Sequence, residues 1–127
     1  MNFQVYVDLT NVDCIWKGGK YKFTVTVPPT FPFNAPKCHC DTQIYHPNID
    51  MLGNICLNIL KADWNPIISI NTVMLGFIFL FMEPNPDDPL NHEAAELMRN
   101  NEQSFKEKVT KTLRGGNFDG AQFVRFI

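Results

Sequence analysis

Cys56 is the residue of this 127-residue chain whose side chain is best suited to covalent chemistry. A cysteine thiol needs little activation as a nucleophile, because a small part of it is already thiolate near neutral pH. Cys56 could therefore carry an acyl group. Asn48 lies eight residues earlier, and its side-chain amide is a suitable donor to the oxyanion that develops when an acyl carbonyl is attacked. Together the two residues could support acyl transfer, although their spacing alone does not distinguish this from simpler roles.

The residues between them favour a rigid segment. Pro47 fixes its own φ and disfavours helix at His46, while Gly53 permits a turn. Each residue also has a simpler interpretation from its type alone. Cys56, between two aliphatic residues, is typical of a small buried hydrophobe, Asn48 of a turn former, and His46 of a structural histidine.

Alternating hydrophobic residues predict the strands that must position this segment. Residues 2–9 and 21–27 alternate between apolar and polar side chains, with a turn at residues 17–20 between them. A third strand is expected near residues 37–42. These three strands would form a small antiparallel meander with one apolar face.

The second half of the chain is predicted to be helical. A helix that begins near Ser69 or Asn71 is apolar on nearly every face, ends before Pro84, and is expected at the buried centre of the domain. Asn91 and Asn101 are predicted to cap two further helices. In the last helix three apolar residues share a stripe, and two charge pairs are spaced four apart: Phe105, Val109 and Leu113; Glu102–Lys106 and Glu107–Lys111. Gly115 and Gly116 would end that helix, and residues 118–127 would pack back as a short helix or an extended arm.

Composition excludes several classes of protein. Eleven basic and thirteen acidic residues give a formal charge of −2 without a basic block, so nothing favours a nucleic-acid partner. The longest apolar run, residues 73–82, is far shorter than the roughly 20 residues of a membrane-spanning helix. We therefore expect one α+β domain over residues 1–127 that binds neither nucleic acid nor membrane.

The cysteines form no regular disulfide framework, and no signal peptide precedes them, so we expect free thiols and a cytoplasmic or nuclear location. Their positions are Cys14, Cys38, Cys40 and Cys56. A metal site that uses Cys38, Cys40, His39 or His46 fits zinc spacings poorly. We expect no metal.

Five stretches of the chain resemble the signature of the ubiquitin-conjugating enzyme family. They are His46-Pro47-Asn48-Ile49, residues 53–60 around Cys56, Trp64-Asn65-Pro66, the proline-rich residues 31–37, and residues 83–91, which resemble the loop that closes over the family's active cysteine. The resemblance implies the UBC fold, in which an antiparallel β-meander packs against a central helix and further helices follow.

Within that family the chain is most similar to the branch that conjugates the NEDD-type ubiquitin-like modifier. Three stretches carry this likeness: residues 60–64 leading to 70–71, residues 89–96, and Leu113-Arg114-Gly115-Gly116. The first two are shared in part with ubiquitin-specific members, so the third discriminates most.

The resemblance implies a thioester mechanism. Cys56 would accept the C-terminal glycine of the modifier from an activating enzyme and pass it to a substrate lysine. Asn48 would meet the oxyanion or hold the closing loop, and Asp88 would position the lysine, which must lose a proton before it attacks. From residue type alone, Asp87-Asp88 before Pro89 is ordinary turn chemistry.

Further roles follow from the resemblance. His46, Pro47 and Trp64 belong to the structural motif, whereas the contacts with a RING-type ligase would come from Phe33, Asn65, Pro66 and Ile67. The remaining partners would be the modifier, the activating enzyme, and substrate lysines, cullins among them. The chain itself would need no cofactor, since ATP is used by the activating enzyme.

One departure from the family concerns the N-terminus. Family members begin with a helix before the first strand, and the neddylation branch adds an extension ahead of it, whereas here Met1 almost adjoins the predicted strand. We therefore expect this chain to lack that helix and some of the docking surface for the activating enzyme.

Three alternatives remain open. The first is a ubiquitin-conjugating enzyme, which has the same chemistry. The second is a non-catalytic UBC-fold scaffold, which the presence of Cys56 disfavours. The third is a cysteine hydrolase with His46 as base and Asp88 as orienting group, which lacks the expected local signatures.

Overall fold

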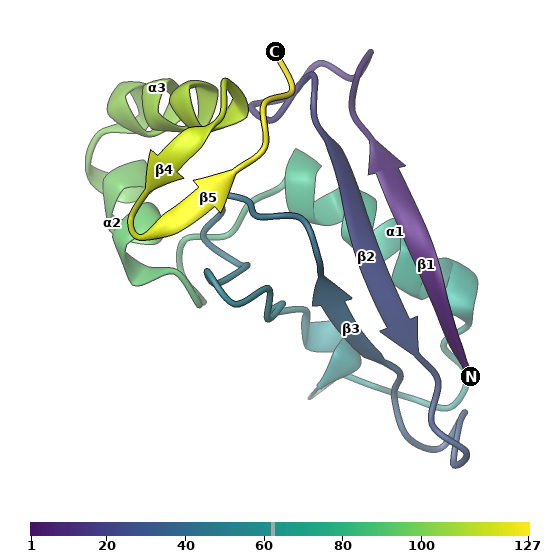
Figure 1. Cartoon of the computed structure of the whole chain (residues 1–127). Coiled ribbons are helices and arrows are strands. Elements are labelled where there is room, and N and C mark those ends of the chain that lie inside the picture. The colour runs from purple at the N-terminus through teal and green to yellow at the C-terminus, as the bar shows by residue number, and fades with distance from the viewer. Residues whose placement is uncertain (62) are drawn as a thin grey trace.

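Three N-terminal strands form an antiparallel sheet in the computed structural model (Figure 1). The strands are β1 (Asn2–Asp8), β2 (Lys20–Thr26) and β3 (Lys37–Cys40), in the order β1-β2-β3. Phe23 pairs with Val5 on one side and with Cys40 on the other. The predicted alternation is confirmed, since Val7, Tyr21, Phe23, Val25 and Cys40 are buried while the residues between them are more exposed.

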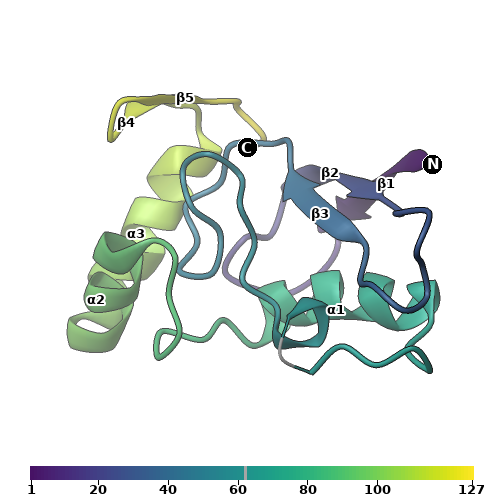
Figure 2. The ribbon, with the colours of Figure 1, turned by 90° about the horizontal axis from the view of Figure 1, so that it is seen from below.

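The long helix α1 (Ile70–Met82) lies along the buried face of this sheet (Figure 2). The Ser69 side chain caps it by accepting a hydrogen bond from Thr72 N. Phe77 stacks on Phe23 with ring centroids 4.5 Å apart, and Phe81 stacks on Tyr21 at 5.1 Å. The aromatic pairs fix α1 against β2.

The expectation that α1 is buried on nearly every face is wrong. The sheet covers the side that carries Val73, Phe77, Leu80 and Phe81. The opposite side leaves four large apolar residues exposed: Leu75, Ile78, Phe79 and Met82. A helix packed on one side of a sheet has only one covered face, so an all-round apolar sequence leaves an apolar surface outside.

Two helices follow where capping asparagines predicted them. The helices are α2 (His92–Asn100) and α3 (Glu102–Leu113). Asn91 Oδ1 accepts a hydrogen bond from Ala94 N, and Asn101 Oδ1 accepts one from Ser104 N, each at 3.1 Å. Both predicted caps are therefore confirmed.

The predicted apolar stripe of α3 is also confirmed, because Phe105, Val109 and Leu113 are buried. Of the two expected charge pairs, Lys106 Nζ lies 3.4 Å from Glu102 Oε1. Glu107 instead accepts a hydrogen bond from Gln103 Nε2 at 3.4 Å.

The end of the chain forms a β-hairpin, not the predicted short helix or extended arm. The hairpin consists of β4 (Gly116–Phe118) and β5 (Ala121–Phe123) and runs beside α3 in Figure 1. Asp119 and Gly120 join the strands with φ values of 53° and 80°. Positive φ at both central residues is typical of the type I′ turn, and Asp-Gly is among the sequences that form it most readily.

The structure describes residues 1–61 and 63–127. Ala62, part of the stretch 60–64 that supports the family resemblance, lies outside the described residues, as does the Asn58 side chain. A short 3₁₀ helix, η1 (Asn58–Leu60), follows Cys56. Within the described part of the chain, every helix is too short or too polar to cross a membrane.

Candidate active site

Asn48 and Cys56 lie on the two arms of one tight turn. Cys56 N donates a hydrogen bond to Asn48 O at 2.9 Å, and Ile49 bridges to Ile55. Asp50 Oδ1 accepts hydrogen bonds from two backbone amides at the tip of the turn. Gly53 there has φ +90°, and a Cβ at this position would collide with the Cys40 carbonyl. The turn is therefore as rigid as its sequence predicts, and it holds the nucleophile beside the amide.

His46 anchors this turn in the core. Its ring is completely buried and stacks on Trp16 at 4.5 Å, and Trp16 Nε1 donates to Tyr45 O at 2.9 Å. His46 Nδ1 accepts from Asn48 N at 2.9 Å, and Nε2 lies 2.7 Å from Leu80 O.

These contacts fix one neutral tautomer, in which Nε2 carries the proton. Burial lowers the pKa of His46 to about 4, against the opposing hydrogen bond to Leu80 O. Both ring nitrogens are occupied away from Cys56. His46 is a structural residue here, and the cysteine hydrolase alternative has no base at this position.

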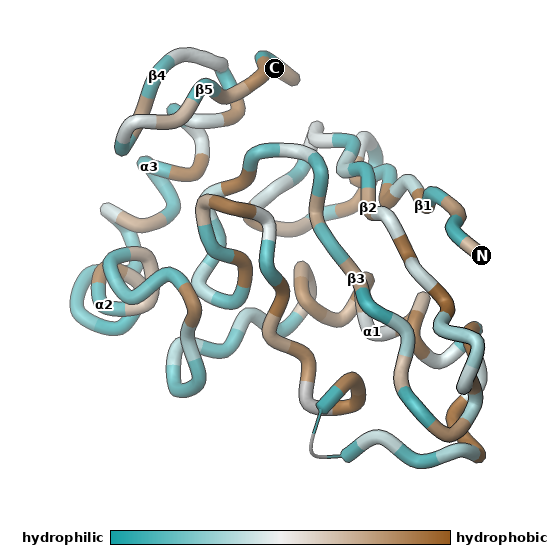
Figure 3. The backbone as a smooth tube through the Cα atoms, turned by 60° about the horizontal axis from the view of Figure 1, so that its bottom comes forward, coloured by the Kyte–Doolittle hydropathy of each residue, from teal (hydrophilic) through white to brown (hydrophobic). Residues whose placement is uncertain are grey.

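The Asn48 side chain binds the loop between α1 and α2, which is hydrophilic along most of its length (Figure 3). Nδ2 donates to Asn85 O at 2.7 Å and to Asp88 O at 3.2 Å. Oδ1 accepts from Asn85 N at 2.8 Å. In this structure the amide of Asn48 therefore supports the loop, which is one of the two roles expected for it.

Pro47 adds a second attachment of the same loop. Its carbonyl oxygen accepts hydrogen bonds from Leu90 N at 2.9 Å and from Asn91 N at 3.1 Å. In the His-Pro-Asn motif, His46 is therefore anchored in the core, and Pro47 and Asn48 bind the loop.

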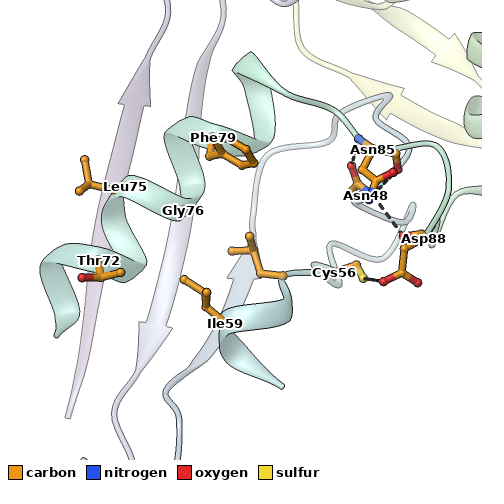
Figure 4. A pocket seen from close by; sticks show the side chains of 10 residues that line it. Asn48, Cys56, Ile59, Thr72, Leu75, Gly76, Phe79, Asn85 and Asp88 are labelled. Carbon is orange, nitrogen blue, oxygen red and sulfur yellow. Dashed lines mark hydrogen bonds between the residues drawn. The ribbon is translucent and has the colours of Figure 1, made fainter. Parts of the chain in front are cut away.

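The loop brings Asp88 to the nucleophile. Cys56 Sγ donates a hydrogen bond to Asp88 Oδ2 at 3.5 Å (Figure 4). Partial burial raises the pKa of the Cys56 thiol, the hydrogen bond and the charge of Asp88 raise it further, and the charge of Lys61 opposes them. The free thiol is thus held largely protonated at neutral pH.

The other cysteines are in less suitable surroundings. Burial raises the pKa of Cys38 and of Cys40 to about 12 each, and burial also raises the pKa of Cys14. All four thiols are free. Among them Cys56 combines partial exposure with a carboxylate partner.

A groove of about 380 Å³ opens at Cys56 and runs along α1 (Figure 4). Asn48, Asn85 and Asp88 make one end polar, and residues of α1, of η1 and of the segment just before η1 make the rest apolar. The apolar lining consists of Leu57, Ile59, Leu75, Gly76 and Phe79, with Thr72 beside them. Sequence reasoning missed the α1 residues of this groove. The sequence signal that could have indicated them is that α1 is apolar on nearly every face, whereas a single sheet covers only one face of a helix.

The four residues expected to contact a ligase lie on two neighbouring loops. Phe33 is 75% exposed and Ile67 is 89% exposed, and Asn65 and Pro66 are exposed as well. Trp64 ties the loops together, because its Nε1 donates to Pro32 O at 3.0 Å and its ring lies 6.0 Å from that of Phe31.

Among the described residues, no three His, Cys, Asp or Glu side chains are grouped closely enough to hold a metal ion. His39 instead pairs with Asp41, whose Oδ1 lies 2.7 Å from Nδ1. Its neighbour Cys40 donates to Thr42 O.

The fold and the site define a class of α+β protein in which a partly exposed cysteine lies beside the loop of residues 83–91. Residues 1–113 match the family described as "Ubiquitin-conjugating enzyme", and the chain belongs to this family. The family resemblance drawn from the sequence is thereby confirmed.

The relatives named after NEDD8 agree with the branch predicted from the sequence. The chain is 46% identical over its full length to "NEDD8-conjugating enzyme Ubc12" of Dictyostelium discoideum and covers 54% of that protein. It is equally identical to the Arabidopsis thaliana protein of the same name and covers 68% of it. The solved structure of S. cerevisiae Ubc12 superposes with a TM-score of 0.90 at 37% identity, over 98% of this chain and 66% of that one. The chain thus spans little more than half of the Dictyostelium relative.

Proposed function

We propose that this chain carries a NEDD8-type modifier as a thioester on Cys56 and transfers it to a substrate lysine. The observation that carries the proposal is the placing of Asp88 3.5 Å from Cys56 by a loop that Asn48 holds. The names of the relatives support the choice of modifier.

In the first step the Cys56 sulfur attacks the thioester that joins the modifier's C-terminal glycine to the activating enzyme. A new thioester forms on Cys56, the activating enzyme's cysteine leaves as a thiolate, and the proton lost by the Cys56 thiol passes to that thiolate through solvent. One thioester replaces another, so this exchange needs little free energy. The chain itself supplies no cofactor in this step.

The groove beside Cys56 supports a polypeptide as the acyl group. A modifier joined through its last residue must continue away from Cys56 as an extended chain. The apolar groove over Leu75, Gly76 and Phe79 begins at the sulfur and leads along α1. The residues that precede the modifier's terminal glycine would lie there.

In the second step a substrate lysine attacks the Cys56 thioester, the tetrahedral oxyanion forms, and the Cys56 thiolate leaves. The Asp88 carboxylate would orient the amine and accept its proton. Asn48 would act through the loop that carries Asp88, with donation to the oxyanion as its second possible role. The raised pKa of the Cys56 thiol makes its thiolate a poorer leaving group, so attack by water and attack by a lysine that Asp88 does not position are both slow.

The partners follow from the same assignment. The exposed Phe33 and Ile67, on the loops tied together by Trp64, would offer apolar contacts to a RING-type ligase. Asn65 and Pro66 would complete it. Cullin-type scaffolds are the substrates that a NEDD8 conjugator implies, in the cytoplasm or the nucleus.

A charging assay tests the choice of modifier. This chain is incubated with ATP and either NEDD8 or ubiquitin, each with its own activating enzyme, and the products are separated without reductant. We expect a reducible adduct with NEDD8. An adduct with ubiquitin alone would make the chain a ubiquitin conjugator, and no adduct with either would favour a non-catalytic scaffold.

A further inference from the structure

Arg99, in the last turn of α2, contacts the loop that carries Asp88 at residues that Asn48 does not bind. Arg99 Nη2 donates a hydrogen bond to Pro86 O at 2.6 Å. The same nitrogen lies 3.5 Å from Asp87 Oδ1. A guanidinium hydrogen bond to a carbonyl is charge-assisted and stronger than a neutral one. The Arg99–Asp87 ion pair is exposed and contributes little by itself.

Asn48 and Arg99 contact different residues of this loop. Asn48 holds Asn85 and Asp88. The two residues in between, Pro86 and Asp87, are the ones that Arg99 reaches. Proline lacks an N–H, so the carbonyl is the only backbone polar group through which Pro86 can be held. Asn48 therefore binds the first and last residues of the turn 85–88, and Arg99 contacts the two residues between them.

These contacts also direct the two adjacent carboxylates, Asp87 and Asp88, to different partners. Asp87 is directed to Arg99, and Asp88 is directed to Cys56. Asp87 N donates to Asn85 Oδ1 at 2.9 Å, which keeps the turn closed. Without Arg99, no side chain of α2 would hold Asp87 away from Cys56 and so leave Asp88 as the carboxylate that faces the sulfur.

The support for Arg99 is rigid. Asn91 caps the start of α2, and Ala94 and Ala95 are buried in its first half. Asn101, which follows the helix, donates its N–H to Leu97 O and caps α3. A side chain at the end of such a helix can fix a loop more precisely than another loop residue could.

We propose that Arg99 is a positioning residue for transfer to lysine, which acts by clamping the Pro86–Asp87 turn so that Asp88 faces Cys56. The inference rests on the function proposed above for Cys56 and Asp88. It assigns no contact between Arg99 and the reacting atoms. Replacing Arg99 should therefore not slow the loading of Cys56.

Single-turnover discharge of the loaded chain to free lysine tests this role. Arg99→Met keeps the length and packing of the stem but removes the donors. We expect transfer to slow about three- to tenfold while the loading rate does not fall. Arg99→Lys, which keeps one donor and the charge, should recover part of the rate. Arg125→Met is the matched control, since Arg125 donates to Ile127 O in the C-terminal segment.

A double-mutant cycle separates positioning through Asp88 from a general structural effect. In the Asp88→Ala background, Arg99→Met should cause no further loss of rate, because nothing remains to be positioned. Losses that multiply would overturn the proposal. If Asp88→Ala alone leaves transfer unchanged, the assigned role of Asp88 fails together with the inference. If Asp88→Ala slows transfer and Arg99→Met does not, only the inference fails.

The free chain offers a second readout that needs no modifier. Because Asp88 raises the pKa of the Cys56 thiol, a loop released by Arg99→Met should lower that pKa, as Asp88→Ala should. The pH dependence of Cys56 alkylation, followed by mass spectrometry of the Cys56 peptide, measures the shift. An unchanged titration in Arg99→Met with a lowered one in Asp88→Ala would contradict the clamp.

Discussion

Cys56 and Asp88 are 32 residues apart in the chain, yet the thiol sulfur lies 3.5 Å from the carboxylate oxygen Oδ2. The turn that follows the His-Pro-Asn motif supplies the sulfur, and the loop between α1 and α2 supplies the carboxylate. Asn48 connects the two segments with hydrogen bonds to Asn85 and Asp88. This connection makes the site sensitive to residues that never touch a substrate.

Replacing the nucleophile should convert a labile adduct into a stable one. In Cys56→Ser the modifier would be held as an oxygen ester, which resists thiols that cleave the thioester. We expect an adduct that survives reductant on a gel and discharges slowly to lysine. Cys14→Ser is the control, and a reducible adduct that persists in Cys56→Ser would place the carrier at another thiol.

Loss of the Asp88 carboxylate should separate loading from transfer. In Asp88→Ala we expect Cys56 to load normally but to discharge to lysine on the order of 10²-fold more slowly, because proton acceptance by a positioned group is lost. The assay is single-turnover discharge of the purified thioester. The control is Glu96→Ala, which removes an exposed carboxylate of α2. This variant should transfer the modifier at the wild-type rate. Equal rates for both variants would rule out the role of Asp88.

Asn48→Ala should weaken the fold as well as the chemistry. Asn48 is buried and makes three hydrogen bonds to the loop. Leaving the loop's polar groups without these partners should lower the free energy of unfolding by about 1–3 kcal/mol, measured by urea denaturation.

The same variant distinguishes the two roles of Asn48. If the amide acts only by holding the loop, Asn48→Ala in the Asp88→Ala background should slow transfer no further. If it also donates to the oxyanion, the two losses should multiply. Wild-type transfer by Asn48→Ala alone would remove both roles.

The groove along α1 can be tested with two residues of one helix. Leu75 lines the groove and is 64% exposed, whereas Ile78 is exposed outside it. Leu75→Glu would place a charge against the apolar segment of the modifier, and we expect loading or transfer to fall about tenfold. Ile78→Glu should have a much smaller effect. Similar losses in both variants would contradict the assigned groove.

The contributions of His46 and His39 to stability should depend on pH in opposite directions. Burial lowers the pKa of His46 to about 4, so His46 binds its proton more readily in the unfolded chain. Stability from this residue is complete above pH 6.5 and is lost as the pH falls from there toward 4, by about 3 kcal/mol in all.

The hydrogen bond to Asp41 raises the pKa of His39, although partial burial opposes it. The contribution of His39 to stability is complete below pH 6.5 and is lost as the pH rises through its folded pKa. An NMR titration of the imidazole nitrogens should show His46 neutral at pH 6 and His39 protonated there. A protonated His46 at pH 6 would contradict the buried single tautomer.

Local patterns in the sequence predicted much of the fold. Period-two alternation located β1 and β2, and Asn91 and Asn101 marked the starts of α2 and α3 where their side chains accept the capping bonds. These features depend on neighbouring residues. The hairpin of β4 and β5 differs from the expected short helix or extended arm, because Asp119 and Gly120 form a tight turn between the apolar residues on either side.

The site was predicted only in part. The types and the family positions of Cys56, Asn48 and Asp88 indicated the chemistry, but nothing in the sequence stated that Asn48 binds both Asn85 and Asp88. Arg99 and the α1 lining of the groove depend on tertiary packing between distant segments. The expected burial of α1 failed for the same reason, since burial depends on how many layers cover a helix.

The most direct test of the central claim is the intact mass of this chain after incubation with ATP, NEDD8 and the NEDD8-activating enzyme. The account predicts one adduct of chain plus modifier minus water, released by a thiol reductant, absent in Cys56→Ala, and retained when Cys14, Cys38 or Cys40 is replaced by serine. No adduct with wild type, or an adduct that persists in Cys56→Ala, would contradict it.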